Sequence, residues 1–594
     1  MSMSDVTSSQ CDVEVMNAPL NPEVFGLLVS AEVDSSLFLP SQFRLVFRDA
    51  PEEVLEPGGL QLATDVVVNV SNSGTPTPLI TAEVTAVEVD YAPDGAFTIV
   101  RGMDKSHRLM RGTTTIAYPD MTASDVVQQL ISQAGLEGAV LPTSTIYEWL
   151  TQANVSAWVF IQQLAALEGC VAFADALGAF HFEPMTQPNE GLPPVMSYLE
   201  PAQGTQLVKG MNLVRLRATV SGAEQVPAVT VTGYDQSMAV PVVGMAPGTP
   251  SSSVSLDPGT LPAVVAGEFG ASPFFDSSRP FDNEGAATTR ARAIADDIAG
   301  ALSEMEGECV GNPSILAGES ISIGMAGRPF DGQYVVSSAR HVFEPSGGGY
   351  TTWFTVGGFR DRSMFSLSSG AGPVDSTRPQ ISGLVVGTVT DNMDDKNLGR
   401  VKVMFPWLSD SYVSAWARTM QVGASKAGGG FLWVPEVGDE VLVGFDRGDV
   451  DYPYVVGNLY NGVTSPEPAP SIDGMVASRR ICSRMKHLVQ FDDGPDAMGI
   501  TIQTGDQTCT IKMDAEQQTI TLNSMGQISI EAGPEGLTIN SQGDVGINAT
   551  GSLSLQGMDV SAQGNGSLSL QGPDVSVTGD GSVSISGPSI SLGS

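Results

Sequence analysis

The sequence predicts a mainly β, multidomain protein, and three observations support this prediction. A chain of 594 residues is too long for a single core. Its 66 Gly and 38 Pro interrupt helices and favour turns between short strands. Residues 500–594 repeat a strand-and-turn unit at a nearly fixed spacing, which is typical of a β-helix. We therefore expect several β-rich domains followed by a β-helical needle.

The region 1–370 is predicted to combine strands with three helices. One helix is expected over 122–134, because Thr122 is a good N-cap with Asp125 three residues later. Others are expected from Ser156 to Gly169 and over 286–303. Short strands separated by turn residues occupy much of the remainder, among them 42–47, 64–70, 79–89 and 332–341. Residues 371–380 are predicted to be a linker, because this stretch is polar and contains Pro.

The region 381–461 is predicted to be an OB-type barrel. Five short strands with long loops suit this fold. The expected strands are 385–390, 400–404, 414–420, 439–445 and 454–459. Residues 462–475 are rich in Pro and are expected to connect this barrel to the needle, residues 476–594.

The needle is predicted from an internal repeat. The sequence GSLSLQG begins at Gly551 and again at Gly566, and it returns as GSVSISG at Gly581, so the unit spans 15 residues. Apolar residues alternate with polar ones inside each unit, so each strand has one apolar face. We call the apolar residues of the clearest repeats the needle seam: Leu553, Leu555, Leu568, Leu570, Val575, Val577, Val583 and Ile585.

The seam is only one small side chain wide. Burying so narrow a face within one chain does not offset the backbone entropy lost on ordering the segment. Copies of the chain that wrap around one another would bury the seam and close the strand edges. We therefore expect an intertwined trimeric β-helix. A β-solenoid formed by a single chain is the alternative.

Composition excludes several classes of function. The formal net charge of −38 argues against binding nucleic acid or an anionic membrane. The five cysteines are scattered without a CxxC pair, so neither a disulfide framework nor a zinc site is expected. The first residues lack a basic and apolar leader, and we expect assembly in the cytoplasm without a signal peptide.

No residue pattern points to catalysis, a metal or a cofactor. The four histidines are far apart, and Asp391, Asp394 and Asp395 do not match a calcium loop, so a solvated turn is expected there. Arg447-Gly448-Asp449 is interpreted as a structural turn, and the tryptophans as core residues. The segment after Lys512 has no basic residue and no aromatic residue, whereas a glycan-active enzyme would need both. We expect a protein that is not an enzyme.

Two sets of motifs resemble known families. Similarity to the OB domain of VgrG-type spike proteins is seen in 399–407 (GRVKVMFPW), 414–418 (SAWAR), 434–443 (VPEVGDEVLV) and 448–461 (GDVDYPYVVGNLYN). Similarity to late-control D and phage baseplate hub proteins is seen in 100–112 (VRGMDKSHRLMRG), 122–136, 332–336 (GQYVV), 339–341 (ARH) and 350–352 (YTT). The sequence of residues 104–111 is similar to that of proteins from extracellular contractile injection systems. The order of hub, OB barrel and needle covers nearly the whole chain.

The resemblance implies a structural hub-spike protein. It would nucleate the inner tube and puncture the target envelope when a sheath contracts. Each chain of a homotrimer would give the hub two barrel-like folds. The implied partners are the inner-tube protein, baseplate proteins, a PAAR-type tip protein and cargo effectors. The implied contacts of the tip protein are Pro588, Ile590, Leu592, Gly593 and Ser594.

Alternatives remain at this point. The same resemblance fits a type VI secretion VgrG or the spike of a temperate phage tail, and the particle would be released or act at the cell envelope. A β-solenoid enzyme or adhesin that acts on glycans is the alternative of another class. No lysozyme-like domain is expected between the barrel and the needle. The last residues lack the histidines that bind iron at some spike tips.

Overall fold

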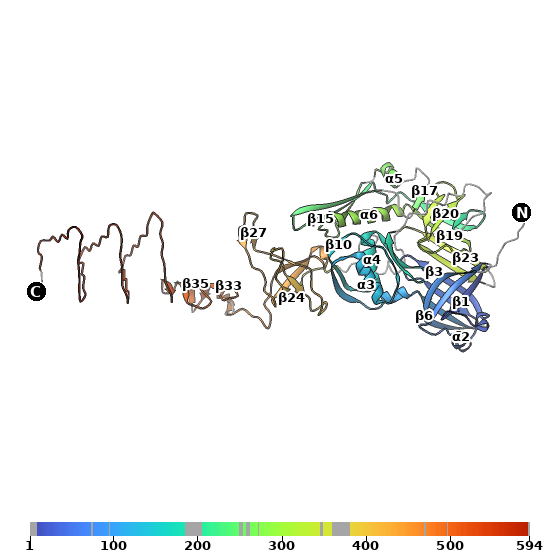
Figure 1. Ribbon diagram of the computed structural model, residues 1–594, viewed down its shortest axis with the longest axis horizontal. Helices are drawn as coiled ribbons and strands as arrows, with labels where there is room; N and C mark the ends of the chain where they lie inside the picture. Colours follow the sequence, from blue (N-terminus) through green and yellow to red (C-terminus); the bar gives the residue numbers. More distant parts are fainter. Residues whose placement is uncertain are drawn as a thin grey trace. The chain divides into compact units, whose positions relative to one another are not determined.

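The computed structural model describes residues 9–72, 75–93, 95–184, 205–248, 254–256, 262–270, 272–344, 349–358, 380–467, 471–495 and 497–591. The chain divides into two compact units, Met1–Ser465 and Pro466–Ser594. Strands dominate the first unit and the beginning of the second (Figure 1). The prediction of a mainly β, multidomain protein is therefore confirmed.

An eleven-stranded sheet forms the centre of the first unit. In spatial order its strands are β14 (Leu213–Val220), β19 (Ser303–Val310), β23 (Gly349–Val356), β22 (Ser338–Glu344), β3 (Leu28–Ser36), β4 (Gln42–Phe47), β7 (Gly95–Met103), β6 (Thr75–Ala92), β5 (Asp65–Asn72), β1 (Gln10–Val15) and β2 (Ala18–Pro19). Pairing of β22 with β3 joins strands about 300 residues apart, with His341 opposite Val33. Alternation gives the sheet two different faces, because Ala31 and Val33 are buried whereas Glu32 and Asp34 lie on the other side.

Three helices build a second core beside this sheet. α3 (Ala123–Gln133) and α4 (Ala157–Glu168) begin as predicted, because the side chains of Thr122 and Ser156 accept hydrogen bonds from backbone N–H groups of the first turn. α6 (Glu284–Gly300) differs from the predicted 286–303. The Asn283 side chain caps it two residues earlier than expected, and β19 begins at Ser303. Trp158, Phe160 and Ile294 lie in this core.

Shorter elements complete the part of the first unit that precedes the OB barrel. The helices are α1 (Pro22–Phe25), α2 (Pro51–Gly58), α5 (Pro262–Glu268) and the 3-10 helix η1 (Lys105–Met110). Four small sheets accompany them. The first contains β10 (Ile146–Val155) and β8 (Thr114–Thr122), and the second contains β11 (Cys170–Ala174), β12 (Phe180–Pro184) and β9 (Gly138–Val140). The third contains β13 (Gln206–Val208), β20 (Ser320–Gly324), β21 (Gly332–Val335) and β17 (Val254–Leu256), and the fourth contains β16 (Val240–Pro247), β15 (Ala228–Asp235) and β18 (Phe274–Asp276).

The OB barrel closes the first unit with five strands, close to their predicted positions. Their order is β25 (Lys402–Met404), β24 (Val385–Asp391), β29 (Glu440–Phe445), β30 (Pro453–Asn458) and β26 (Arg418–Thr419). The 3-10 helix η2 (Asp446–Gly448) and the hairpin β27 (Gly423–Ala424) and β28 (Gly430–Phe431) are added to it. Val403, Phe405 and Val443 are fully buried in the barrel core. The predicted linker 371–380 lies outside the described residues except for Gln380.

The second unit begins with a small hairpin and a single antiparallel sheet. The hairpin pairs β31 (Ser471–Ile472) with β32 (Met475–Val476), and the sheet contains β33 (Ser478–Cys482), β34 (Leu488–Gly494), β35 (Ala497–Gln503), β36 (Cys509–Asp514) and β37 (Thr519–Ser524) in chain order. Residues 525–591 form no strand. The short strands expected there are therefore absent from one chain, because a strand needs a paired neighbour. The chain does not form the alternative single-chain solenoid over 525–591.

Candidate assembly interface

The sheet of β33 to β37 has one continuous apolar face. Residues directly opposite each other in an antiparallel pair point to the same side of the sheet. Two neighbouring rows cross all five strands on this side: Ile481, Val489, Ile502, Ile511 and Leu522, then Arg479, Phe491, Ile500, Met513 and Ile520. The row between them points to the other side and is polar: Arg480, Gln490, Thr501, Lys512 and Thr521. We call the first side the apolar sheet face.

The apolar sheet face is uncovered in a single chain. Ile502 is 43% exposed and Ile520 is 72% exposed. An apolar sheet face needs a second layer to exclude water, and large uncovered apolar patches mark interaction sites. Only the strands near Ile500 and Ile520 were expected here from the sequence. Three further strands were not expected. The apolar residues Ile481 on β33, Val489 and Phe491 on β34, and Ile511 and Met513 on β36 alternate with polar ones and mark them.

The predicted needle seam has the same property. All eight seam residues are described, and each is between 50% and 71% exposed. Of the predicted tip contacts, Pro588 and Ile590 are exposed, and Leu592, Gly593 and Ser594 lie outside the described residues. The roles of the seam and tip residues stay predictions. The structure establishes that one chain leaves the seam open to solvent.

A buried ion pair joins the OB barrel to the rest of the first unit. Nε of Arg279 lies 3.3 Å from Oδ2 of Asp449, and its Nη2 lies 3.9 Å from Oδ2 of Asp451. Nη1 of Arg447 donates to the carbonyl oxygen of Arg279 at 2.7 Å. The Arg447-Gly448-Asp449 turn is therefore structural, as expected. Its Arg447 and Asp449 also provide contacts of the barrel with Arg279.

A second contact to the barrel comes from β10. The Thr151 hydroxyl lies 3.3 Å from the Tyr412 hydroxyl, and Ala153 packs into the barrel core. Nζ of Lys402 lies 5.6 Å from the centre of the Trp149 ring, which is a cation–π distance. The barrel is therefore attached to the rest of the first unit at several points, since Nε2 of Gln236 also donates to the Tyr454 hydroxyl at 2.9 Å.

Two expectations about polar and aromatic residues are wrong. Asp394 is buried rather than solvated, because its carboxylate accepts hydrogen bonds from Nη2 of Arg400 at 2.6 Å and from the Leu398 N–H at 2.7 Å. These bonds hold the pKa of Asp394 well below its usual value, with the Arg400 contact as the main cause. The tryptophans are not all core residues, since Trp353, Trp407 and Trp433 are exposed.

A buried carboxylate ties β6 to η1. Oε1 of Glu83 lies 2.6 Å from Nε2 of His107 and 3.0 Å from Nε of Arg108. The hydrogen bond from Arg108 is the main cause that lowers the pKa of Glu83 to about 2, and His107 adds to it. A carboxyl group with a lowered pKa in the folded state stabilises the protein above its unfolded pKa and loses this effect as the pH falls.

Glu83→Gln is therefore expected to lower the free energy of unfolding at pH 7 by about 2 kcal/mol, since it weakens charge-assisted hydrogen bonds. The difference from the unmodified protein should shrink as the pH falls from about 4.5 towards about 2. Thermal unfolding across this pH range measures it. Glu88→Gln is the control, because the Glu88–Arg101 pair is half exposed and should contribute less than about 1 kcal/mol. An equal loss in both variants would contradict the role of Glu83.

The described residues offer few features of other site classes. They contain no group of three or more metal-ligating side chains. None of their helices is long and apolar enough to cross a membrane. The five cysteines are all free.

Comparison with known proteins places the OB barrel in a defined class. Residues 385–460 match the model of the type VI secretion system/phage-baseplate injector OB domain. Residues 83–344 match the Alg8 N-terminal domain. The chain is thus a multidomain β protein that contains an injector-type OB domain.

Individual relatives narrow this class. The chain is 36% identical over 102 residues to the type VI secretion system spike protein VgrG3 of Vibrio cholerae, covering 16% of this chain and 10% of that protein. It is 31% identical over 132 residues to VgrG2a of Pseudomonas aeruginosa, covering 20% and 16%. The matches thus span only a tenth to a sixth of these relatives. A chain of a Francisella PdpA–VgrG complex shares the fold at 9% identity, with a TM-score of 0.50 over 87% of this chain and 88% of that one. The resemblance to VgrG-type spike proteins is confirmed.

Proposed function

We propose that this protein is the structural hub-spike of a contractile injection machine and acts as a homotrimer. The first unit would be the hub on which the inner tube starts. The second unit would be the spike that punctures the target envelope when the sheath contracts. The observation that carries the proposal is the uncovered apolar sheet face, which follows an injector-type OB barrel in the chain.

Three copies of this sheet would form a closed prism. Each sheet would turn its apolar face inward and its Arg480–Thr521 row outward. The seam would continue the dry interior through the repeats. A prism with few free strand edges is stiff, and stiffness is the property that a puncturing device needs. The sheath would supply the work, so we propose no catalytic role, metal or cofactor.

The proposed partners follow from the same arrangement. Inner-tube and baseplate proteins would bind the hub, and a PAAR-type protein would cap the needle near Pro588 and Ile590. Cargo effectors are further proposed partners. The particle would assemble in the cytoplasm and then be released or act at the envelope. A type VI VgrG or a temperate-phage spike is the second candidate, and the VgrG relatives named above favour the type VI form.

The mass of the purified protein in solution tests the proposal. We expect a trimer for the full chain and a loss of stable trimer when residues 476–594 are removed. A monomeric full-length protein would refute the hub-spike proposal. A glycan-hydrolysis assay with measurable turnover would revive the glycan-active alternative.

Single substitutions in the repeats test the assigned faces. Leu570→Asp or Val577→Asp should prevent trimer formation, because each would place a carboxylate in the dry interior of the prism. Ser569→Asp should leave the trimer intact, because Ser569 lies between seam residues and faces outward. Analytical ultracentrifugation measures the outcome. If Leu570→Asp and Ser569→Asp behave alike, the faces are assigned wrongly.

A further inference from the structure

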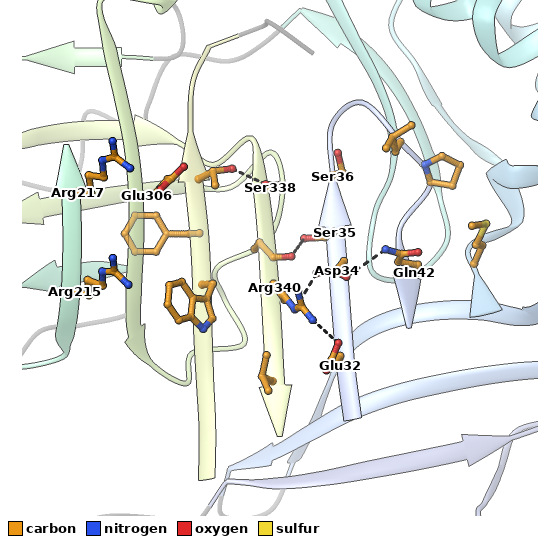
Figure 2. Close-up of a pocket in the computed structure, with 18 of the residues that line it drawn as sticks. Glu32, Asp34, Ser35, Ser36, Gln42, Arg215, Arg217, Glu306, Ser338 and Arg340 are labelled. Atoms are coloured by element: carbon orange, nitrogen blue, oxygen red, sulfur yellow. Dashed lines mark hydrogen bonds and ion pairs between the residues drawn. The ribbon is translucent and has the colours of Figure 1, made fainter. Parts of the chain in front are cut away.

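A groove crosses the polar face of the eleven-stranded sheet. Its volume is about 760 Å³, and it lies over β14, β19, β23, β22, β3 and β4 (Figure 2). Figure 2 shows Arg215 and Arg217 on one side of it, and Glu32, Asp34 and Arg340 on the other. None of these charged side chains lies in the core, so core packing does not explain why they cluster here.

The charges follow a strand-by-strand order. β3 carries Glu32 and Asp34, and Arg340 on β22 pairs with both of them. Trp353 on β23 separates this cluster from the acidic residues of β19. Glu308 and Glu306 on β19 lie opposite Arg215 and Arg217 on β14. On this face, acidic β3 lies beside basic β22, and beyond Trp353 on β23 acidic β19 lies beside basic β14, which is the last strand.

β14 is the end strand of this sheet. Within the described residues it is hydrogen-bonded to β19 on one side, and no strand follows it on the other. A strand at an edge presents a row of backbone N–H and C=O groups that can pair with another chain. Arg215 and Arg217 are both exposed and form no ion pair with the other residues drawn in Figure 2. Leu213, at the start of β14, forms an isolated bridge with Lys209. Among the described residues, no other strand residue pairs with the backbone of β14 on this side.

The two faces of β14 specify what that neighbour should contain. Arg215 and Arg217 are two residues apart, so their side chains stand about 7 Å apart on one face. Carboxylates at alternate positions of an added strand would match this spacing. The other face of β14 carries Leu216 and Ala218, which are half-buried and pack against the core. Val214 lies at the register shift between Leu213 and Arg215 and is 64% exposed. Apolar residues at the intervening positions of the added strand would match this face.

We propose that β14 binds an extended acidic segment of another protein by strand addition. The segment would alternate acidic and apolar residues, and two of its carboxylates would pair with Arg215 and Arg217. This mode of recognition uses backbone hydrogen bonds for affinity and alternate side chains for specificity. The site lies on the hub sheet, so the proposal does not depend on the trimeric needle.

A synthetic peptide tests the proposal on the full-length protein. The probe is acetyl-Thr-Val-Glu-Val-Glu-Val-Thr-amide, and a second peptide carries Lys in place of both Glu. Titration calorimetry should show binding of the Glu peptide and at least tenfold weaker binding of the Lys peptide. Hydrogen exchange should show new protection of the backbone amides of β14 with the Glu peptide. Methylation of alternate peptide nitrogens should abolish both effects.

Charge exchange makes the test specific. The double variant R215E/R217E should bind the Glu peptide at least tenfold more weakly and should gain affinity for the Lys peptide. Arg101→Glu is the matched control on the same sheet, and it should leave Glu-peptide binding unchanged. Circular dichroism verifies that each variant is folded.

Three results would overturn the proposal. They are the absence of Glu-peptide binding at millimolar concentration, equal binding of the two peptides, and protection without peptide of those β14 amides that are not bonded to β19. The last result would show that this edge is already covered in the full-length protein. None of these results would change the mass of the full-length trimer, so they are distinguishable from a failure of the hub-spike proposal.

Discussion

Ile502→Asp is expected to convert the proposed trimer to a monomer. Ile502 lies on β35, the middle strand of its sheet, within a row of apolar side chains that runs across all five strands. Ile502 is 43% exposed in one chain and would be buried in the proposed trimer. Loss of a buried isoleucine alone costs at least about 2–3 kcal/mol per chain, and burial of a carboxylate adds to it. Three chains contribute, so the association constant should fall by about a millionfold or more. Sedimentation velocity at micromolar concentration measures the change.

The neighbouring residue provides the control for this substitution. Thr501 is on the same strand and points to the polar side, next to Lys512 in the register. Thr501→Asp should therefore leave the trimer intact. If both variants remain trimeric, the apolar sheet face is not the surface that joins the chains. If both become monomeric, the loss reflects damage to the strand rather than to the face.

Arg279→Met should produce the second large effect, at the joint between the OB barrel and the hub. The Arg279 side chain is 12% exposed, and those of Asp449 and Asp451 are 8% and 2% exposed. Removal of the cation from a buried pair costs on the order of 3–5 kcal/mol, because the carboxylates stay out of water. We expect the midpoint of urea unfolding, monitored by tryptophan fluorescence, to shift to a lower urea concentration. Limited proteolysis should cut the chain between the hub and the barrel at an earlier time.

An exposed arginine serves as the reference for this loss. Arg101 is 2.8 Å from Glu88, and both side chains are about half exposed. Arg101→Met should therefore cost less than about 1 kcal/mol. If Arg279→Met costs as little as Arg101→Met, the joint depends on the contacts of Thr151 and Ala153 instead.

The features that were predictable from the sequence depend on residues close together in the chain. Thr122 and Ser156 marked the starts of α3 and α4, because capping involves residues within one turn. The seam also follows from a local pattern, the alternation in the C-terminal repeats, and its role stays a prediction. The start of α6 was missed because Asn283, the residue that caps it, was not recognised as a cap.

The features that were not predictable depend on distant residues. Arg279 and Asp449 are 170 positions apart, and nothing local marks them as partners. The sequence predicts a solvated turn at Asp394, but the Arg400 side chain folds back and bonds to its carboxylate. The edge position of β14 depends on the order of strands drawn from both ends of the hub sequence. Such contacts are properties of topology, which composition and periodicity do not encode.

The absence of any strand in residues 525–591 of one chain has a consequence for biogenesis. The first unit contains its own cores and can fold as each chain leaves the ribosome. In the proposed trimer the repeats would acquire strand partners only after separate chains meet, so their folding should become faster as the protein concentration rises. Until then each newly made chain exposes the apolar residues of its repeats. The net negative charge of the chain would slow non-specific association with other chains.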